Sequence, residues 1–182
     1  MVDHMNSKTF DITSIALMTA VTTVMAQIAI PMPAGVPMTL QTFAVTLAGV
    51  VLGSKNGGLS MVLYILMGAI GLPVFSGFRG GLAMLVGPTG GFLLSFPVMA
   101  FIIGLGVKYI KDKPLIFWSY LALGTIINYI IGTIVFSLST GSGLVPSFMA
   151  CVFPFIPTAV IKLIVGGLMG IRLRDAVPQL KH

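Results

Sequence analysis

Arg79 and Lys162 are the two side chains of this sequence that are best suited to bind an anion. Lys162 stands within a long apolar stretch, and Arg79 stands in a segment rich in glycine and aromatic residues. The chain has four acidic residues, and all of them lie outside the apolar stretches: Asp3, Asp11, Asp112 and Asp175. Since neither cation has an evident carboxylate partner within the chain, we expect both to meet an anionic ligand, such as a carboxylate on the planar guanidinium.

Uncharged polar residues supply further candidates for a binding site: Gln41, Tyr64, Thr89, Asn128 and Thr158. In membrane bundles such residues, Gln27 included, bond a neighbouring helix more often than a ligand. Gln41 is the strongest exception, because it follows a proline-rich segment. Thr89 belongs to the run GPTGG at residues 87–91, where free amides at the start of a helix can receive an acceptor group.

Several kinds of chemistry lack the residues that they need. The sequence has no GxxxxGK[S/T] run to bind the phosphates of ATP. Both histidines, His4 and His182, stand near the ends of the chain, where a catalytic metal site is not expected. The apolar stretches hold no acid to relay protons. We therefore expect a protein that is not an enzyme, needs no cofactor or metal, and captures a solute for partners that supply the energy.

The composition places these residues in lipid rather than in a soluble fold. Of 182 residues, 57% are hydrophobic and only 8% are charged, whereas soluble domains carry roughly 25% charged residues. The single cysteine, Cys151, allows no internal disulfide. The sequence thus predicts an all-α integral membrane protein with one transmembrane domain over residues 1–182, of which residues 1–4 resemble a cloning remnant.

Six apolar segments predict a bundle of six transmembrane helices, because backbone groups in lipid must be satisfied within a helix. They cover residues 12–30, 40–52, 59–72, 90–110, 115–138 and 148–171. Asp11 is predicted to cap the first segment, Pro114 to open the fifth, and residues 53–58 to form a turn. Residues 31–37 and 73–89 are apolar yet rich in helix-breaking residues, so we expect these two loops to fold over a pocket.

Lys162 is predicted to lie deep within the sixth segment. It precedes Arg172 by ten residues, which corresponds to roughly 15 Å of helix. If Arg172 marks the membrane edge, Lys162 lies about halfway across a hydrocarbon core ~30 Å thick. Burying a lysine there costs about 2.5–3.5 kcal/mol on insertion scales, so a partner or a water-filled cavity is expected.

The basic residues indicate how the bundle is oriented. Eight of the ten fall at one end of the six-helix arrangement: Lys8, Lys55, Lys108, Lys111, Lys113, Arg172, Arg174 and Lys181. Cytoplasmic loops collect Lys and Arg, so both termini are predicted to be cytoplasmic. Orientation and contact with anionic headgroups then account for the net charge of +6, and binding to nucleic acid is not expected.

Pairs of small residues four positions apart predict close contacts between helices. The pairs are Ala16/Ala20, Gly49/Gly53 and Gly166/Gly170. Such spacing by itself favours packing within the bundle, and contact with another subunit is its less common use.

Three motifs occur at residues that flank the predicted pocket: VPMTLQTF at 36–43, GLPVFSG at 71–77 and GPTGGF at 87–92. Together they resemble the BioY family, the biotin-binding S components of energy-coupling-factor (ECF) transporters. The resemblance extends from the first helix to Lys162. It implies a six-helix protein of the prokaryotic cell membrane that holds biotin near its outer face, beneath the first and third loops, with Arg79 and Lys162 at basic positions that hold the vitamin.

The resemblance also implies partners, namely a transmembrane coupling subunit and two ATPase subunits. In S components an AxxxA pair on the first helix docks onto the coupling subunit, and Ala16 and Ala20 match that pair. One departure concerns Lys162: the family pattern PGDxxK reads PTAVIK at residues 157–162, with Ala159 in place of the aspartate. Either Thr158 takes over a polar contact, or Lys162 relies wholly on the charge of the ligand.

The expected function is therefore high-affinity capture of biotin as the S component of an ATP-driven vitamin transporter. One alternative is an S component for another small anionic vitamin. The other is a structural membrane subunit whose basic residues hold anionic lipid. Competition among vitamins separates the first alternative from biotin capture, and a lack of effect of Arg79 and Lys162 on solute uptake identifies the second.

Overall fold

The structure, a computed structural model, describes the backbone of residues 2–32 and 35–177 and the side chains of residues 8–32 and 35–177. The elements are α1 (Val2–Gln27), β1 (Ala29–Ile30), β2 (Met38–Thr39), α2 (Gln41–Ala69), α3 (Leu82–Val86), α4 (Gly90–Leu94), α5 (Phe96–Gly106), η1 (Val107–Tyr109), α6 (Pro114–Thr140), α7 (Leu144–Cys151), η2 (Phe153–Phe155) and α8 (Ile156–Ala176). The predicted helical fold is confirmed. The predictions for Met1, Lys181 and His182 concern residues outside the described part.

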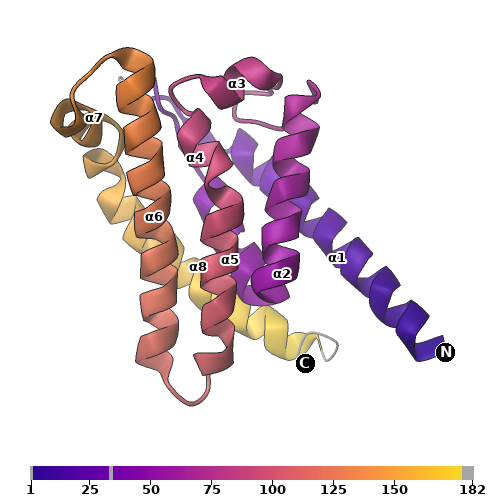
Figure 1. Ribbon diagram of the computed structural model, residues 1–182. Helices are drawn as coiled ribbons and strands as arrows, with labels where there is room; N and C mark the ends of the chain where they lie inside the picture. The colour runs from indigo at the N-terminus through magenta and orange to yellow at the C-terminus, as the bar shows by residue number, and fades with distance from the viewer. Residues whose placement is uncertain (1, 33–34, 178–182) are drawn as a thin grey trace.

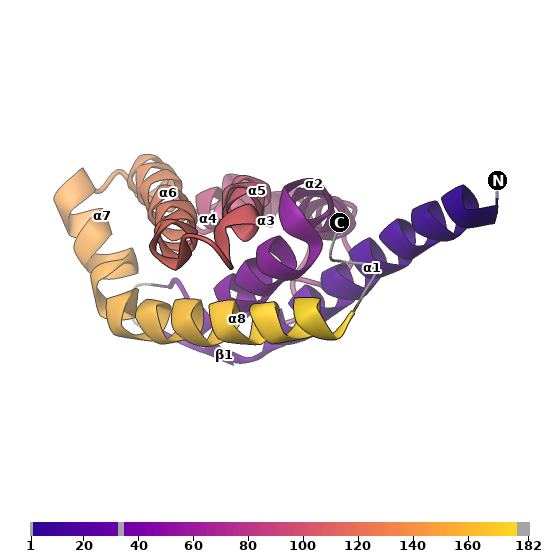
Figure 2. The same ribbon diagram turned by 90° about the horizontal axis from the view of Figure 1, so that it is seen from below.

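The helices form a bundle from which α1 diverges toward its N-terminal end (Figures 1 and 2). The beginning of α1, the end of α8 and the connection between α5 and α6 lie at one end of the bundle, and α3 and α7 lie at the other (Figure 1). The short strands β1 and β2 pair antiparallel, Ala29 with Thr39 and Ile30 with Met38. They bring the loop after α1 back to the start of α2.

The second and third predicted segments are joined in α2, with a break at Gly53. This glycine has φ 77° and ψ −175°, a conformation outside the helical range that a residue without a Cβ adopts readily. Beyond the break the chain packs back on itself, because a Cβ at Gly57 would lie 2.8 Å from the carbonyl oxygen of Ala48. The predicted turn at 53–58 is therefore limited to Gly53, and residues 54–58 are helical.

Five helical runs of the described chain are long and apolar enough to cross a membrane: Lys8–Gln27, Gln41–Ala69, Gly90–Tyr109, Pro114–Thr140 and Leu144–Ala176. The count differs from the predicted six because α2 is continuous apart from Gly53. Pro114 stands in the first turn of α6, as predicted. The prediction for Asp11 is wrong: α1 begins at Val2, and Asp11 instead accepts a 2.8 Å hydrogen bond from Nδ2 of Asn56.

Glycines on α8 allow it to pack closely on α2. A Cβ at Gly166 would lie 3.1 Å from the side chain of Thr46, and one at Gly170 would lie 2.7 Å from Val50. Gly49, on the same part of α2, faces Ala100 and Ile103 of α5. The predicted internal packing is confirmed for these three glycines, whereas Gly53 forms the break in α2.

Candidate functional site

A cavity of about 640 Å³ lies at the end of the bundle that carries α3, between the two proline- and glycine-rich loops and the nearby helix ends. Its walls come from residues 31–32 and 35–37, from the segment 75–89, and from α2, α4, α6 and α8. Small-molecule sites are commonly cavities of about 300–1,000 Å³ with apolar walls and a few polar groups. The prediction that both loops fold over a pocket is confirmed.

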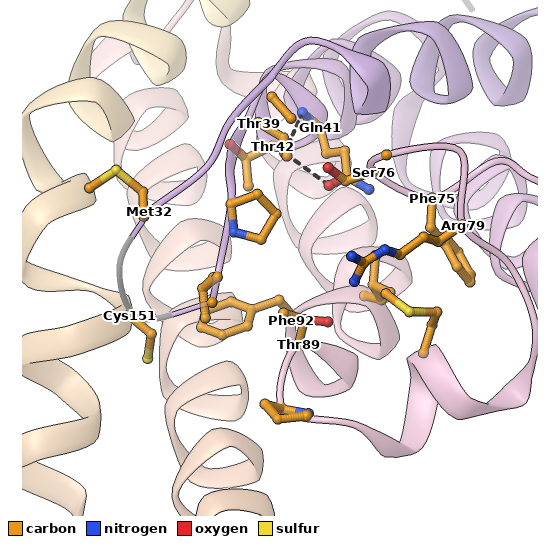
Figure 3. A pocket seen from close by; sticks show the side chains of 18 of the residues that line it. Met32, Thr39, Gln41, Thr42, Phe75, Ser76, Arg79, Thr89, Phe92 and Cys151 are labelled. Carbon is orange, nitrogen blue, oxygen red and sulfur yellow. Dashed lines mark hydrogen bonds between the residues drawn. The ribbon is translucent and has the colours of Figure 1, made fainter.

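Arg79 reaches into this cavity from a tight turn. Its backbone pairs with Phe75, with the Phe75 amide donating to the Arg79 carbonyl at 2.9 Å and the Arg79 amide donating to the Phe75 carbonyl at 3.3 Å. Figure 3 shows the guanidinium pointing from this turn toward the middle of the cavity. Within the described residues the guanidinium has no hydrogen bond and no salt bridge, so its charge is available to a ligand.

Lys162 lies on α8 and lines the same cavity. Its Nζ donates a 3.1 Å hydrogen bond to the backbone carbonyl of Thr39, at the end of β2. No carboxylate of the described residues pairs with it. A carbonyl satisfies one of the three ammonium donors without neutralising the charge. The cavity thus holds a second cation that a ligand anion can compensate.

Gln41 and Tyr64 form one hydrogen-bonded chain beside the cavity. Gln41 Nε2 donates to the Tyr64 hydroxyl at 2.7 Å, and that hydroxyl donates to the Val74 carbonyl at 3.0 Å. The Thr39 hydroxyl donates to Gln41 Oε1 at 2.9 Å (Figure 3). Gln41 lines the cavity, whereas Tyr64 is fully buried behind it and is not part of the lining. Tyr64 therefore holds in place both Gln41 and the loop at residues 73–89, to which Val74 belongs.

Asn128 has a side-chain oxygen with no hydrogen-bond partner in the described part of the chain. Its Nδ2 donates to the Phe92 carbonyl at 2.9 Å and to Ser95 Oγ at 2.7 Å, so both amide protons are used. Oδ1 is buried without a hydrogen bond, although Asn128 lines the cavity. Buried polar atoms are nearly always paired in folded proteins. No described residue donates to this oxygen, so a ligand or a water that reaches it would supply the missing hydrogen bond.

Thr42 is a second such residue, and sequence reasoning missed it as a candidate. Its Oγ1 is buried without a partner among the residues that the structure describes, and Thr42 lines the cavity next to Gln41 (Figure 3). A threonine within a helix usually donates to the carbonyl four residues earlier, as Thr46 does to Thr42 at 2.9 Å. Thr42 is the second residue of α2, so the residue four positions earlier lies in β2. That Thr42 lacks the usual helical acceptor for its hydroxyl can be recognised only once the first residue of α2 is known.

Thr89 and Thr158 differ in their relation to the cavity. Thr89 lines it, and its side chain forms no cap bond with α4. Thr158 is not part of the lining, and its hydroxyl donates to the Phe155 carbonyl at 2.9 Å. Ala159 is buried and faces a separate apolar groove between α6 and α7–α8. The residues that replace the family glycine and aspartate thus lie away from the cavity.

Aromatic side chains form much of the apolar wall. Phe92, Phe96, Tyr129 and Phe155 line the cavity, and Phe92 packs edge-on against Tyr129 with ring centroids 6.5 Å apart. The arrangement suits a small molecule with an apolar body, an anionic end for the two cations, and an N–H or O–H donor for Asn128 Oδ1. Such a site binds its ligand through shape and charge.

The chain is similar to known biotin transporters over most of its length. The biotin transporter BioY of Rhodobacter capsulatus is 41% identical over 152 residues, which cover 78% of this chain and 80% of the relative. The biotin transporter BioY of Thermotoga maritima is 41% identical over 161 residues, covering 87% and 92%. The probable biotin transporter BioY of Pyrococcus horikoshii is 39% identical over 170 residues, covering 92% and 98%.

A solved structure has the same fold. The crystal structure of the S-component for biotin from an ECF-type ABC transporter matches with a TM-score of 0.85 and 31% identity, and the match covers 93% of each chain. The family profile described as BioY family matches residues 2–179. With five apolar helical runs and relatives named as transporters along its length, the chain is a multi-pass membrane protein, and it belongs to the BioY family.

Proposed function

We propose that this chain binds biotin with high affinity as the S component of an ECF-type transporter in the prokaryotic cell membrane. The observation that supports this most directly is the set of charged and polar residues that line the cavity. Arg79 and Lys162, two cations that no described carboxylate neutralises, line the same space as Asn128, whose Oδ1 has no described partner. A ligand that carries a carboxylate, N–H donors and an apolar body complements all three.

Biotin has these features. Its carboxylate suits Arg79 or Lys162, and its ureido N–H groups suit an acceptor such as Asn128 Oδ1. Its apolar bicycle suits the aromatic wall that Phe92 and Phe155 contribute. Gln41, Thr42 and Thr89 are the further lining residues that we assign to the ligand, and Tyr64 supports Gln41 from behind.

The position of Thr158 bears on how Lys162 functions without the aspartate of the family pattern, which Ala159 replaces in this chain. The Thr158 hydroxyl donates to the Phe155 carbonyl, and Thr158 does not line the cavity as Lys162 does, so we do not assign to it the polar contact of a carboxylate. Lys162 has only the neutral Thr39 carbonyl as a described partner. We infer that Lys162 depends on the charge of the ligand itself, which strengthens its attraction for an anion.

The topology and partners follow the same proposal. We assign six crossings to a single transmembrane domain by counting residues 41–52 and 54–69 of α2 separately, with both termini in the cytoplasm. Ala16 and Ala20 are exposed on α1, so they are free to dock on a transmembrane coupling subunit that works with two ATPase subunits. Docking on a partner subunit requires that these two alanines be exposed on the isolated chain.

Equilibrium binding to the purified, detergent-solubilised chain tests the proposal. We expect tight binding of biotin, measured by isothermal titration calorimetry. Labelled biotin that is already bound should be displaced by excess unlabelled biotin but not by other anionic vitamins. Circular dichroism verifies that the helices are intact. A folded chain that binds no biotin contradicts the proposal. Tight binding of a different anionic vitamin supports another S component, and binding of anionic lipid alone supports a structural subunit.

A further inference from the structure

We propose that Gln27 is a positioning residue that aims the Arg79 guanidinium into the cavity. Gln27 is the last residue of α1, and Arg79 lies 52 positions later in the chain. The inference rests on the proposed function for the identity of the ligand. It rests on the structure alone for the link between α1 and the turn at residues 75–79.

The carboxamide of Gln27 contacts both sides of that turn. Its Nε2 donates to the Phe75 carbonyl at 3.1 Å and lies 3.4 Å from the Val74 carbonyl. Its Oε1 accepts from the backbone amide of Phe78 at 2.9 Å. One side chain from α1 therefore satisfies a carbonyl on the incoming arm and an amide on the outgoing arm of the turn.

Phe78 shows why the turn needs such support. Among the described residues it is the one non-glycine residue with a positive φ, 56°, and it follows Gly77, whose φ is 71°. A bulky side chain disfavours this conformation, so it persists only where surrounding bonds hold it. The Phe78 ring is 72% exposed and packs on little. The hydrogen bond from its amide to Gln27 therefore helps to hold this residue in that conformation, together with the backbone pair between Phe75 and Arg79.

The position of Arg79 depends on the same bonds. Arg79 follows Phe78 directly, and its amide donates to the Phe75 carbonyl, which also accepts from Gln27. The guanidinium has no described partner of its own, so the backbone position of Arg79 decides which space its flexible side chain can reach. Without Gln27 the turn can relax at Phe78, and the guanidinium then samples positions outside the cavity.

A direct contact of Gln27 with the ligand is the competing explanation, since Gln27 also lines the cavity. The described bonds argue against it. Nε2 is shared among the Val74, Phe75 and Thr23 carbonyls, the last at 3.1 Å. The two amide protons are therefore occupied, and Oε1 already accepts from Phe78. A role through Arg79 leaves all of these bonds in place.

A double-mutant cycle tests the inference on the full chain. We expect Gln27→Met, which keeps the size and removes both hydrogen-bonding groups, to raise the biotin dissociation constant about tenfold. In an Arg79→Ala background the same substitution should change it by less than about twofold, because the group to be positioned is gone. Adding Phe78→Gly to Gln27→Met should restore part of the affinity, since glycine adopts the positive φ freely.

Asn56→Ala is the matched control. It also removes a side-chain hydrogen bond to α1, the one to Asp11, and should leave biotin affinity unchanged. Equal losses from Gln27→Met with and without Arg79 would show a direct ligand contact and overturn the inference. An unchanged dissociation constant in Gln27→Met, or in Arg79→Ala, would overturn it as well.

Limited trypsin digestion gives a readout that needs no ligand. Cleavage of the bond after Arg79, followed by mass spectrometry on detergent-purified protein, should be faster in Gln27→Met than in wild type and Asn56→Ala, because a released turn fits a protease site. Equal cleavage rates in all three proteins contradict the inference. If wild type binds no biotin, the proposed function fails, and the digestion still decides whether Gln27 holds the turn.

Discussion

At the scale of single residues, the cavity is defined by charges and polar atoms that the chain leaves without full partners. Lys162 meets a neutral carbonyl of Thr39, and Asn128 Oδ1 meets no described donor. A buried charge or polar atom in this state is costly, and a complementary ligand recovers the cost on binding. These groups therefore cost the unbound protein some stability, and ligand binding is a physical reason for the protein to keep them.

Substitution of Lys162 by alanine should weaken biotin binding more than about tenfold, which corresponds to about 1.4 kcal/mol. The reason is that the ligand loses a cation that no described carboxylate neutralises. Calorimetric titration measures the change, and Lys108→Ala is the control: Lys108 lies in η1, at the opposite end of the bundle, beside the Tyr109 ring. An unchanged dissociation constant for Lys162→Ala would exclude Lys162 from the site.

At the scale of elements, α1 stands apart from the other helices. It diverges from the bundle along its N-terminal half (Figure 2), and its exposed side carries large apolar residues, among them Ile12 and Val24, which are 69% and 63% exposed. Residues four apart share one face of a helix, so Ala16 and Ala20 lie between these two. Two small residues flanked by larger ones form a shallow surface on which a second helix can pack closely.

Enlarging this surface should impair coupling and not binding. We expect Ala20→Leu to reduce biotin uptake severalfold in cells that also express the coupling and ATPase subunits, because the added side chain keeps the partner helix at a distance. Ala20→Ser keeps the small volume and should behave as wild type. Biotin binding to the isolated chain should be equal in all three. A normal uptake rate for Ala20→Leu would place the docking surface elsewhere.

At the scale of the whole molecule, the two ends of the bundle have different characters. One end carries the cavity, α3 and α7, and the other carries the connection between α5 and α6, with Lys108, Lys111 and Lys113. Cytoplasmic loops collect such basic residues. The cavity is therefore expected to open on the outer side of the membrane, where a vitamin arrives.

Cysteine labelling in intact cells tests this orientation. In a Cys151→Ser background, Ser139→Cys should react with a membrane-impermeant maleimide added outside, whereas Lys111→Cys should react only after the cells are permeabilised. Both positions are exposed: Ser139 lies in the last turn of α6, and Lys111 lies in the loop that precedes this helix, at the opposite end of the bundle. Labelling is read as a mass shift. The reverse pattern would invert the topology and place the cavity in the cytoplasm.

Much of the fold and part of the site could be predicted because they depend on local composition. Apolar length alone indicates spanning helices, and a lack of acids in those stretches means that none of them can supply Lys162 with a carboxylate partner. Glycine and proline in residues 31–37 and 73–89 argue against a spanning helix there, and the second stretch holds only the short helix α3 (Leu82–Val86), so both loops were expected to lie at a cavity or within protein. Because Arg79 stands in the second of these loops, its place at the cavity could be predicted as well.

Other features could not be predicted, because they depend on which way a side chain points and what lies opposite it. Tyr64 and Asn128 are both buried polar residues of apolar helices, yet the Tyr64 hydroxyl is satisfied within the protein and Asn128 keeps an oxygen that no described residue bonds. Asp11 lies inside α1 because that helix begins earlier than its composition indicates. The bonds from Gln27 to the turn at Arg79 join residues about fifty positions apart. Hydropathy and charge are properties of the chain in one dimension, whereas the pairing of donors with acceptors is decided only when the helices pack.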